Sequence, residues 1–161
     1  MKIGIGFDVH RVESGRKLIL GGVLIPFEGK GLLGHSDGDV IFHAIADAIA
    51  GALAEPDIGT TFPDTDPATA GISSHIILGR YAALLKRRNA AIENLDIIIL
   101  AEEPKLRAWY QEIRTSIAGA LAIPEDRVGI KAKTMEGLGP IGEQKAIGCW
   151  AAIIVSEKNK Q

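Results

Sequence analysis

The chain has 161 residues, of which 47% are hydrophobic and 24% are charged, and its formal net charge is −2. This composition indicates one globular domain over residues 1–161, and the weak negative charge argues against binding to nucleic acid or to anionic membranes. No apolar run approaches the ~20 residues of a membrane span, and a single cysteine excludes an internal disulfide framework and fits a reducing cytosol.

Residues 4–11 (GIGFDVHR) are predicted to form a strand, because small and β-branched residues lead into an acid and a histidine. Side chains two apart on a strand share a face, so Asp8 and His10 project together. An oxygen and a nitrogen ligand so placed suit zinc, which prefers four ligands. The alternative is a solvated polar rim at the strand end, so a metal site requires a further ligand from elsewhere in the chain.

Residues 17–26 predict a β-hairpin around two glycines, and the glycine-rich residues 28–34 predict a loop. A helix should follow from Val40 to about Leu53, with Ser36 and Asp39 as a capping box at its start.

His43 lies inside this apolar helix, and Asp39 and Asp47 share its face because each is four residues away. Such a line of polar groups is costly to bury unless the groups are paired or bind a metal. His43 is therefore the candidate third ligand, and either aspartate could orient its imidazole. The alternative is a buried histidine satisfied by Asp47.

The rest of the chain alternates between loops, helices and strands. In order, we expect a loop of turns over residues 55–67, a helix from 73 or 74 to about 89, a strand over 95–100, a loop over 101–106, a helix over 108–121, a strand over 127–134, a loop over 135–144 and a last strand over 146–155.

The last strand is apolar on both faces, which suggests that one face meets helices and the other meets another subunit. The fold class is thus α/β (α+β), a single domain with a mixed, mainly four-stranded sheet and helices packed against it.

Three candidate ligands without cysteine indicate a catalytic zinc site with an open position, which could accept water or a phosphate oxygen. His35 precedes the same helix near its positive end, a favourable place for an anion. Thr134 and Glu136 end a strand, and Glu136 could hold magnesium together with substrate phosphates. These residues suggest two-metal phosphate chemistry.

The motifs resemble those of the 2-C-methyl-D-erythritol 2,4-cyclodiphosphate synthase family nearly from end to end. The resemblance rests on Gly6-Phe7-Asp8-Val9-His10, His35-Ser36-Asp37-Gly38-Asp39-Val40 with His43, Asp57-Ile58-Gly59, Phe62-Pro63-Asp64-Thr65-Asp66-Pro67, Pro104-Lys105-Leu106 and Lys131-Ala132-Lys133-Thr134 with Glu136.

This resemblance implies a homotrimer whose sheets meet and whose active sites lie between subunits, in the bacterial cytoplasm or, for a mature eukaryotic chain, the plastid stroma. The implied substrate is 4-diphosphocytidyl-2-C-methyl-D-erythritol 2-phosphate, whose 2-phosphate attacks the β-phosphorus and expels CMP. The implied metals are Zn²⁺ or another divalent cation on Asp8, His10 and His43, and Mg²⁺ or Mn²⁺ on Glu136. The implied catalytic residues are His35 and Thr134.

The resemblance also implies a substrate-binding set in three parts. Near the metal lie Asp8, Val9, His10, His35 and Ser36; around the methylerythritol phosphate lie Asp57, Ile58, Gly59, Phe62, Pro63, Asp64, Thr65 and Asp66; around the cytidine diphosphate, from the neighbouring subunit, lie Ala101, Glu102, Glu103, Pro104, Lys105, Leu106, Arg107, Ala132, Lys133, Thr134, Met135 and Glu136.

Two other functions stay open at this point. The zinc could activate water, which would make the protein a nucleotide-diphosphate hydrolase. Alternatively, the protein could be a non-catalytic trimer that binds isoprenoid diphosphates. Against this last reading, residues 142–145 are Gly-Glu-Gln-Lys where many family members have Gly-Arg-Gly-Glu, whose arginine helps to line a central cavity.

Overall fold

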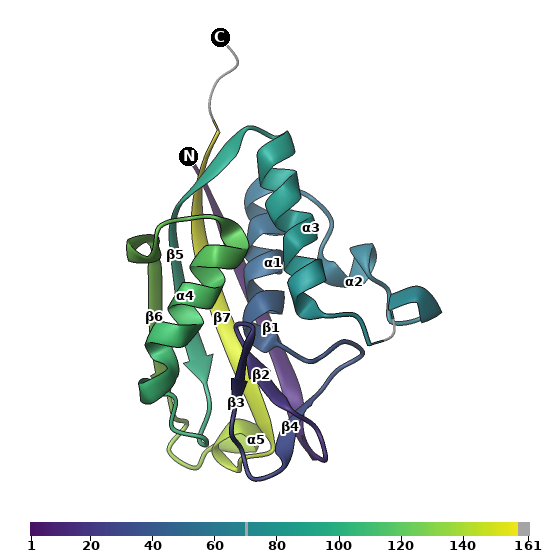
Figure 1. The fold of residues 1–161 in the computed structure, drawn as a ribbon, viewed down its shortest axis with the longest axis vertical. Helices are drawn as coiled ribbons and strands as arrows, with labels where there is room; N and C mark the ends of the chain where they lie inside the picture. Colours follow the sequence, from purple (N-terminus) through teal and green to yellow (C-terminus); the bar gives the residue numbers. More distant parts are fainter. Residues whose placement is uncertain (70, 158–161) are drawn as a thin grey trace.

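In a computed structural model of the chain, which describes residues 1–69 and 71–157, a mixed sheet lies beneath a layer of helices (Figure 1). The sheet has five strands in the order β4-β1-β7-β5-β6, of which β5 and β6 pair in parallel and the other neighbours are antiparallel. Its strands are β1 Lys2–Ser14, β4 Lys30–Leu33, β5 Ala90–Leu100, β6 Val128–Lys133 and β7 Ala146–Glu157. A separate hairpin pairs β2 Leu18–Leu20 with β3 Val23–Ile25.

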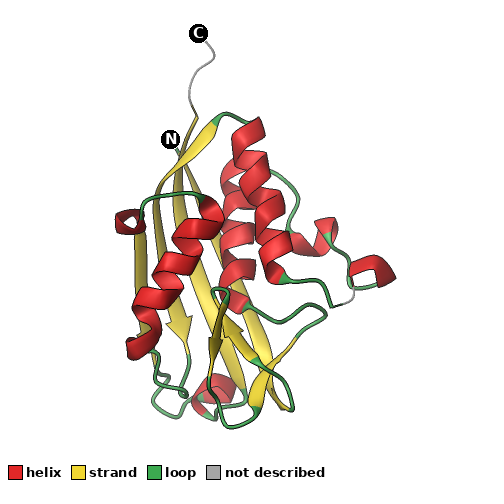
Figure 2. Ribbon diagram, in the orientation of Figure 1, coloured by secondary structure: helices red, strands yellow, loops and turns green. Residues whose placement is uncertain are grey.

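The three long helices cover one face of the sheet (Figure 2). They are α1 Val40–Leu53, α3 Ser74–Arg87 and α4 Tyr110–Leu121, and short helices α2 Ile58–Thr61 and α5 Gly139–Gly142 lie in the loops, with 3₁₀ turns at Pro67–Thr69, Arg107–Trp109 and Glu125–Arg127. Within residues 1–69 and 71–157, no helix has both the length and the apolar character needed to span a bilayer.

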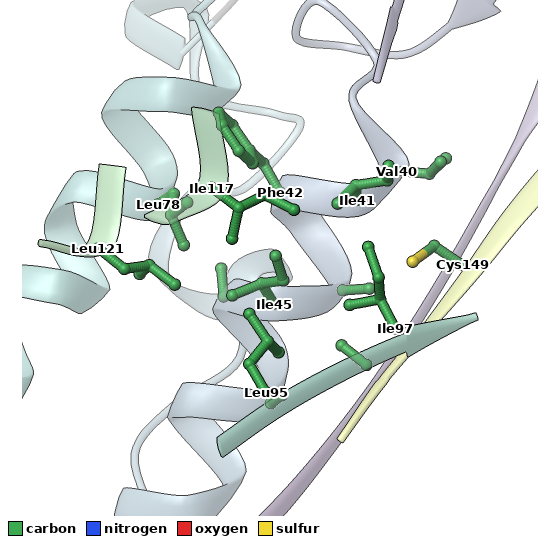
Figure 3. Packing of buried hydrophobic residues seen from close by; sticks show 14 of the residues in the cluster. Val40, Ile41, Phe42, Ile45, Leu78, Leu95, Ile97, Ile117, Leu121 and Cys149 are labelled. Atoms are coloured by element: carbon green, nitrogen blue, oxygen red, sulfur yellow. The ribbon is translucent and has the colours of Figure 1, made fainter. Parts of the chain in front are cut away.

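Helix α1 occupies the centre of the core. Its apolar side chains meet residues of α3, α4, β5 and β7 (Figure 3), and those labelled are Val40, Ile41, Phe42, Ile45, Leu78, Leu95, Ile97, Ile117, Leu121 and Cys149. This burial supplies the main stabilisation of the fold.

Two glycines bring α1 unusually close to β1. A Cβ atom added to Gly4 would lie 1.8 Å from the carbonyl oxygen of Ala48, and one added to Gly6 would lie 2.0 Å from that of Ala44. Only glycine allows this approach of helix and strand. The two metal-ligand candidates that follow on β1 are thereby placed beside α1.

Most predicted elements are confirmed, including the hairpin, α1, α3 and β7. The predicted loop over residues 28–34 is wrong in part, because Lys30–Leu33 pairs with β1 as the fifth strand. The predicted capping box is also wrong: Asp39 alone caps α1 and accepts hydrogen bonds from the backbone N–H groups of Ile41 and Phe42, while Ser36 bonds elsewhere. The strand β4 was not predicted because a short edge strand that contains glycine shows little hydrophobic periodicity.

Over β1 and β7, the sheet face opposite the helices is apolar and exposed in the single chain. Ile3 and Ile5 of β1 are 70% and 63% exposed, and Phe7 stacks on Trp150 of β7 with ring centroids 4.6 Å apart. The helices cover one face of β7, as predicted, and every second residue of this strand points to the other face. That another subunit covers this face stays a prediction.

Candidate metal centre and active site

Asp8, His10 and His43 converge as predicted. The Oδ2 atom of Asp8 lies 2.9 Å from Nδ1 of His43 and 3.0 Å from Nε2 of His10, and the two nitrogens are 3.2 Å apart. The strand places the first two residues and the adjacent helix places the third, through the glycine contact described above. The two imidazole rings are nearly perpendicular, with an interplanar angle of 77°, so their edges meet near one point.

This donor set fits a divalent metal ion. One carboxylate oxygen and two imidazole nitrogens can each offer a lone pair, and the ligand atoms all lie within 4.8 Å of one another. Three such ligands form a site that keeps a fourth position open, as in catalytic zinc centres. The residues present therefore suit a metal that acts on a bound oxygen atom.

Charge couples these three side chains. Burial disfavours ionised Asp8, but hydrogen bonds and charge from His10 and His43 outweigh burial and hold the pKa of this carboxyl well below its usual range. Burial also acts to lower the pKa of His43, but the hydrogen bond and charge of Asp8 win and raise that pKa above 6.5. The metal-free cluster thus favours a carboxylate beside a protonated imidazole.

The neighbours of His43 differ from those predicted. Its Nε2 atom contacts the hydroxyls of Ser36 at 3.1 Å and Ser74 at 2.8 Å. Asp39 instead caps α1, and Asp47 accepts a hydrogen bond of 2.9 Å from the backbone N–H of Ile58. The predictions that one of these aspartates orients or satisfies the imidazole are therefore not supported by the observed hydrogen bonds.

A cavity of about 250 Å³ opens beside the three candidate ligands. It brings together residues from β1, α1, α2, α3 and the loops around them, namely Asp8, His10, His35, Ser36, His43, Asp47, Ile58, Gly59, Phe62, Thr69, Ile72 and Ile77. Seven of the predicted site residues other than His43 thus share one cavity, and Thr69, Ile72 and Ile77 were missed. Asp47, which the sequence placed on the helix face of His43, also lines the cavity.

The other residues predicted to bind near the metal or around the methylerythritol phosphate do not line this cavity. Asp57 caps α2 and accepts a hydrogen bond of 2.8 Å from the backbone N–H of Thr60. Residues 63–66 form an adjoining turn, in which the Asp66 N–H donates to the Pro63 carbonyl at 3.1 Å. Val9 lies on β1 between Asp8 and His10, so its side chain points to the opposite face of the sheet.

The predicted nucleotide-binding residues form a second group at the ends of β5 and β6. The two loops are joined, because the Ala101 N–H donates to the Lys133 carbonyl at 3.0 Å and the Met135 N–H donates to the Glu102 carboxylate at 3.1 Å. Thr134 donates to Glu136 at 3.2 Å, and both residues are exposed.

Within one chain, the second group does not reach the metal ligands. Asp8 aligns with Cys149, Cys149 with Ile99, and Ile99 with Ala132, so β7 and β5 separate the two groups. Three strand spacings amount to about 14 Å between the Cα atoms of Asp8 and Ala132.

The fold and the site define a class: an α+β protein with an Asp-His-His group that can hold a metal ion beside a small cavity. The chain belongs to the YgbB family, whose model matches residues 1–156. A relative from Caldicellulosiruptor bescii, named 2-C-methyl-D-erythritol 2,4-cyclodiphosphate synthase, is 50% identical over 156 residues that cover 97% of this chain and 99% of the relative. A relative of the same name from Dehalococcoides mccartyi is 50% identical over 158 residues, covering 98% of this chain and all of the relative.

Solved structures agree with these relatives. The chain is similar to the CDP complex of IspF from Plasmodium falciparum, with a TM-score of 0.86 and 40% identity, covering 98% of this chain and 97% of the other. It is also similar to the bifunctional IspDF from Campylobacter jejuni, with a TM-score of 0.93 and 35% identity, covering 98% of this chain and 42% of the other.

Proposed function

We propose that this protein is a cyclodiphosphate synthase, a phosphorus–oxygen lyase of non-mevalonate isoprenoid biosynthesis. It converts 4-diphosphocytidyl-2-C-methyl-D-erythritol 2-phosphate to 2-C-methyl-D-erythritol 2,4-cyclodiphosphate and CMP. The observation that carries this proposal is the convergence of Asp8, His10 and His43 at a cavity, in a chain that is 50% identical to synthases over nearly its whole length. Residues 1–161 form its single domain, in the bacterial cytoplasm.

In this reaction the protein has to position the two phosphates and offset their negative charge. The 2-phosphate oxygen of the substrate forms a bond to the β-phosphorus, and the bond from that phosphorus to the oxygen of CMP breaks, so CMP leaves with the electron pair. The nucleophile belongs to the substrate, and the main obstacle is to bring two anionic phosphates together in line.

Asp8, His10 and His43 would hold Zn²⁺, and Glu136 would hold Mg²⁺ or Mn²⁺ against the diphosphate. Bound divalent ions supply positive charge that offsets the charge of the phosphate oxygens. His35 lines the cavity near the start of α1, where its imidazole can donate to a phosphate oxygen. Thr134 orients the diphosphate from the second group, and the residues around Ile58 and Phe62 enclose the methylerythritol.

The complete site is proposed to lie between subunits of a homotrimer. Two observations support this arrangement: the two residue groups are separated by two strands within one chain, and the exposed sheet face is apolar over β1 and β7. A second copy could supply residues 101–107 and 132–136 to the metal-bearing cavity, while the apolar faces meet.

Mixed oligomers test the shared site. His43→Ala and Glu136→Ala chains should each be inactive alone. After joint refolding in equal amounts, about a quarter of the sites would combine two intact halves if subunits assort at random. Recovery of about that share of wild-type activity supports the shared site. No recovery, with mixed trimers verified by mass spectrometry, contradicts it.

Phosphorus NMR of the product separates the proposed reaction from hydrolysis. A cyclic diphosphate is expected, and its formation should stop when a chelator removes the metals. Linear phosphates would instead favour a hydrolase. A non-catalytic isoprenoid-diphosphate carrier would yield neither, and its ligand affinity would survive His43→Ala. That carrier is disfavoured because Glu143 stands where many family members have an arginine, and Lys145, the nearest cation in this stretch, pairs with Glu143 at 2.6 Å.

A further inference from the structure

His43 presents one ring nitrogen to the metal-ligand group and the other to the protein. Its Nδ1 atom faces Asp8 at 2.9 Å, and its Nε2 atom faces the Ser74 hydroxyl at 2.8 Å. An imidazole that gives the Nδ1 lone pair to a metal carries its proton on Nε2. Since His43 is only 8% exposed, this proton requires an acceptor within the protein.

Ser74 is oriented to be that acceptor. It is the first residue of α3 and is fully buried. Its hydroxyl donates to one carboxylate oxygen of Asp37, and its backbone N–H donates to the other at 3.1 Å. A hydroxyl has one proton and two lone pairs. Because the Ser74 hydroxyl donates its hydrogen bond to Asp37, a lone pair of the Ser74 oxygen is left to accept from Nε2 of His43.

Ser36 is the weaker partner of the same nitrogen. Its hydroxyl oxygen lies farther from Nε2 of His43, at 3.1 Å, and already accepts a hydrogen bond from the backbone N–H of Gly38 at 3.1 Å. Asp37 therefore acts on the imidazole mainly through Ser74.

We propose that Ser74 and Asp37 are positioning residues of the metal centre, which together fix His43 in the tautomer that offers Nδ1 to the ion. The inference rests on the proposed metal site. The hydrogen-bonded chain prevents rotation of the ring and places a carboxylate where it increases the basicity of the ligand nitrogen. It also ties the start of α3 to α1, so that a residue far away in sequence determines the geometry of the ligand.

Zinc affinity tests this role directly. In Ser74→Ala, zinc should bind about 10- to 100-fold more weakly, measured by competition with a chromophoric chelator. Asp37→Asn keeps an acceptor for the Ser74 hydroxyl but removes the charge, so a smaller loss is expected. The matched control is Ser73→Ala, which removes the N-cap of α3 but no contact with His43. This control should lower the melting temperature and leave zinc affinity unchanged.

Histidine tautomers supply a second readout. In zinc-loaded wild-type protein, long-range ¹H–¹⁵N NMR should show a slowly exchanging proton on Nε2 of His43. This proton should exchange faster in Ser74→Ala and remain slow in Ser73→Ala. The proposal is overturned if Ser74→Ala binds zinc as tightly as the wild type and keeps the slow proton. If Ser74→Ala does not fold, equal affinity in Asp37→Asn and the wild type overturns it. A wild-type protein that binds no zinc overturns the metal site itself, which is a distinguishable result.

Discussion

The two halves of the proposed active site are built in opposite ways. The metal-binding half lies between β1 and α1, where His43 is nearly buried and its ring makes hydrogen bonds at both nitrogens. The proposed nucleotide-binding half consists of the loops after β5 and β6, of which residues 133–136 are exposed, while Ala101 and Leu106 are buried and residues 102–104 are half-buried. The comparison teaches that one chain can complete a metal site, because its ligands come from elements that pack on each other. The proposed substrate site needs loops from a second subunit, because the two residue groups lie apart in one chain.

Among the changes that separate the two halves, loss of a metal ligand should lower activity most. His43→Ala removes a ligand of the metal-binding half, and loss of several kcal/mol of charge stabilisation corresponds to a fall in kcat on the order of 10³-fold. Metal content by elemental analysis should fall with activity, while circular dichroism stays native because α1 keeps its core residues. An unfolded variant would mean that the ion holds the fold together.

The next largest effect should come from a substitution that separates β1 from α1, and it should appear in stability and in metal binding. A Cβ in Gly6→Ala would lie 2.0 Å from the Ala44 carbonyl oxygen, so β1 and α1 must separate. We expect a loss of about 3 kcal/mol in the free energy of unfolding by urea titration, together with weaker metal binding. Gly79→Ala on α3 is the control, because a Cβ there meets nothing within 4 Å. It should stabilise by about 0.5–1 kcal/mol. Equal free energies of unfolding for Gly6→Ala and Gly79→Ala would contradict the close contact between β1 and α1.

The charges of the metal-free half predict a pH window of stability. The pKa of Asp8 lies below its ordinary 3.8 in the folded protein, so its contribution is present above that pH and is lost as the pH falls. The pKa of His43 lies above its ordinary 6.5, so its contribution is present below that pH and is lost as the pH rises.

Chelated wild-type protein should therefore exceed Asp8→Asn in stability most clearly between about pH 4 and pH 6.5, limits given by the ordinary pKa values of the two groups. The difference should be on the order of 1 kcal/mol and should shrink on either side. Thermal unfolding of both proteins across pH 3–9 measures it, and a difference that does not vary with pH would refute the coupling.

The smallest effect on stability should come from the nucleotide-binding half. Glu102→Ala removes the hydrogen bond from the Met135 N–H that joins the loops after β5 and β6. We expect a change of less than about 1 kcal/mol in the free energy of unfolding and unaltered zinc affinity, with weaker binding of CDP by calorimetry. Loss of zinc from this variant would mean that the two halves are not independent.

The sequence alone determined the three candidate metal ligands and nearly all the elements. Asp8 and His10 share a strand face by simple alternation, and His43 stands out as a polar residue in an apolar helix. It also carried the motifs that resemble those of the family. Local pattern is sufficient here because strand and helix periodicity depend on neighbouring residues only.

The tertiary structure decided which residues from distant parts of the chain contact one another. It gave Nε2 of His43 the hydroxyls of Ser36 and Ser74 as partners in place of Asp39 or Asp47. It also paired Lys30–Leu33 with β1. It also placed β7 and β5 between the two halves of the site. Each of these facts depends on contacts between segments far apart in the chain, and such contacts follow from how apolar surfaces pack. Side-chain identity at one position does not encode them.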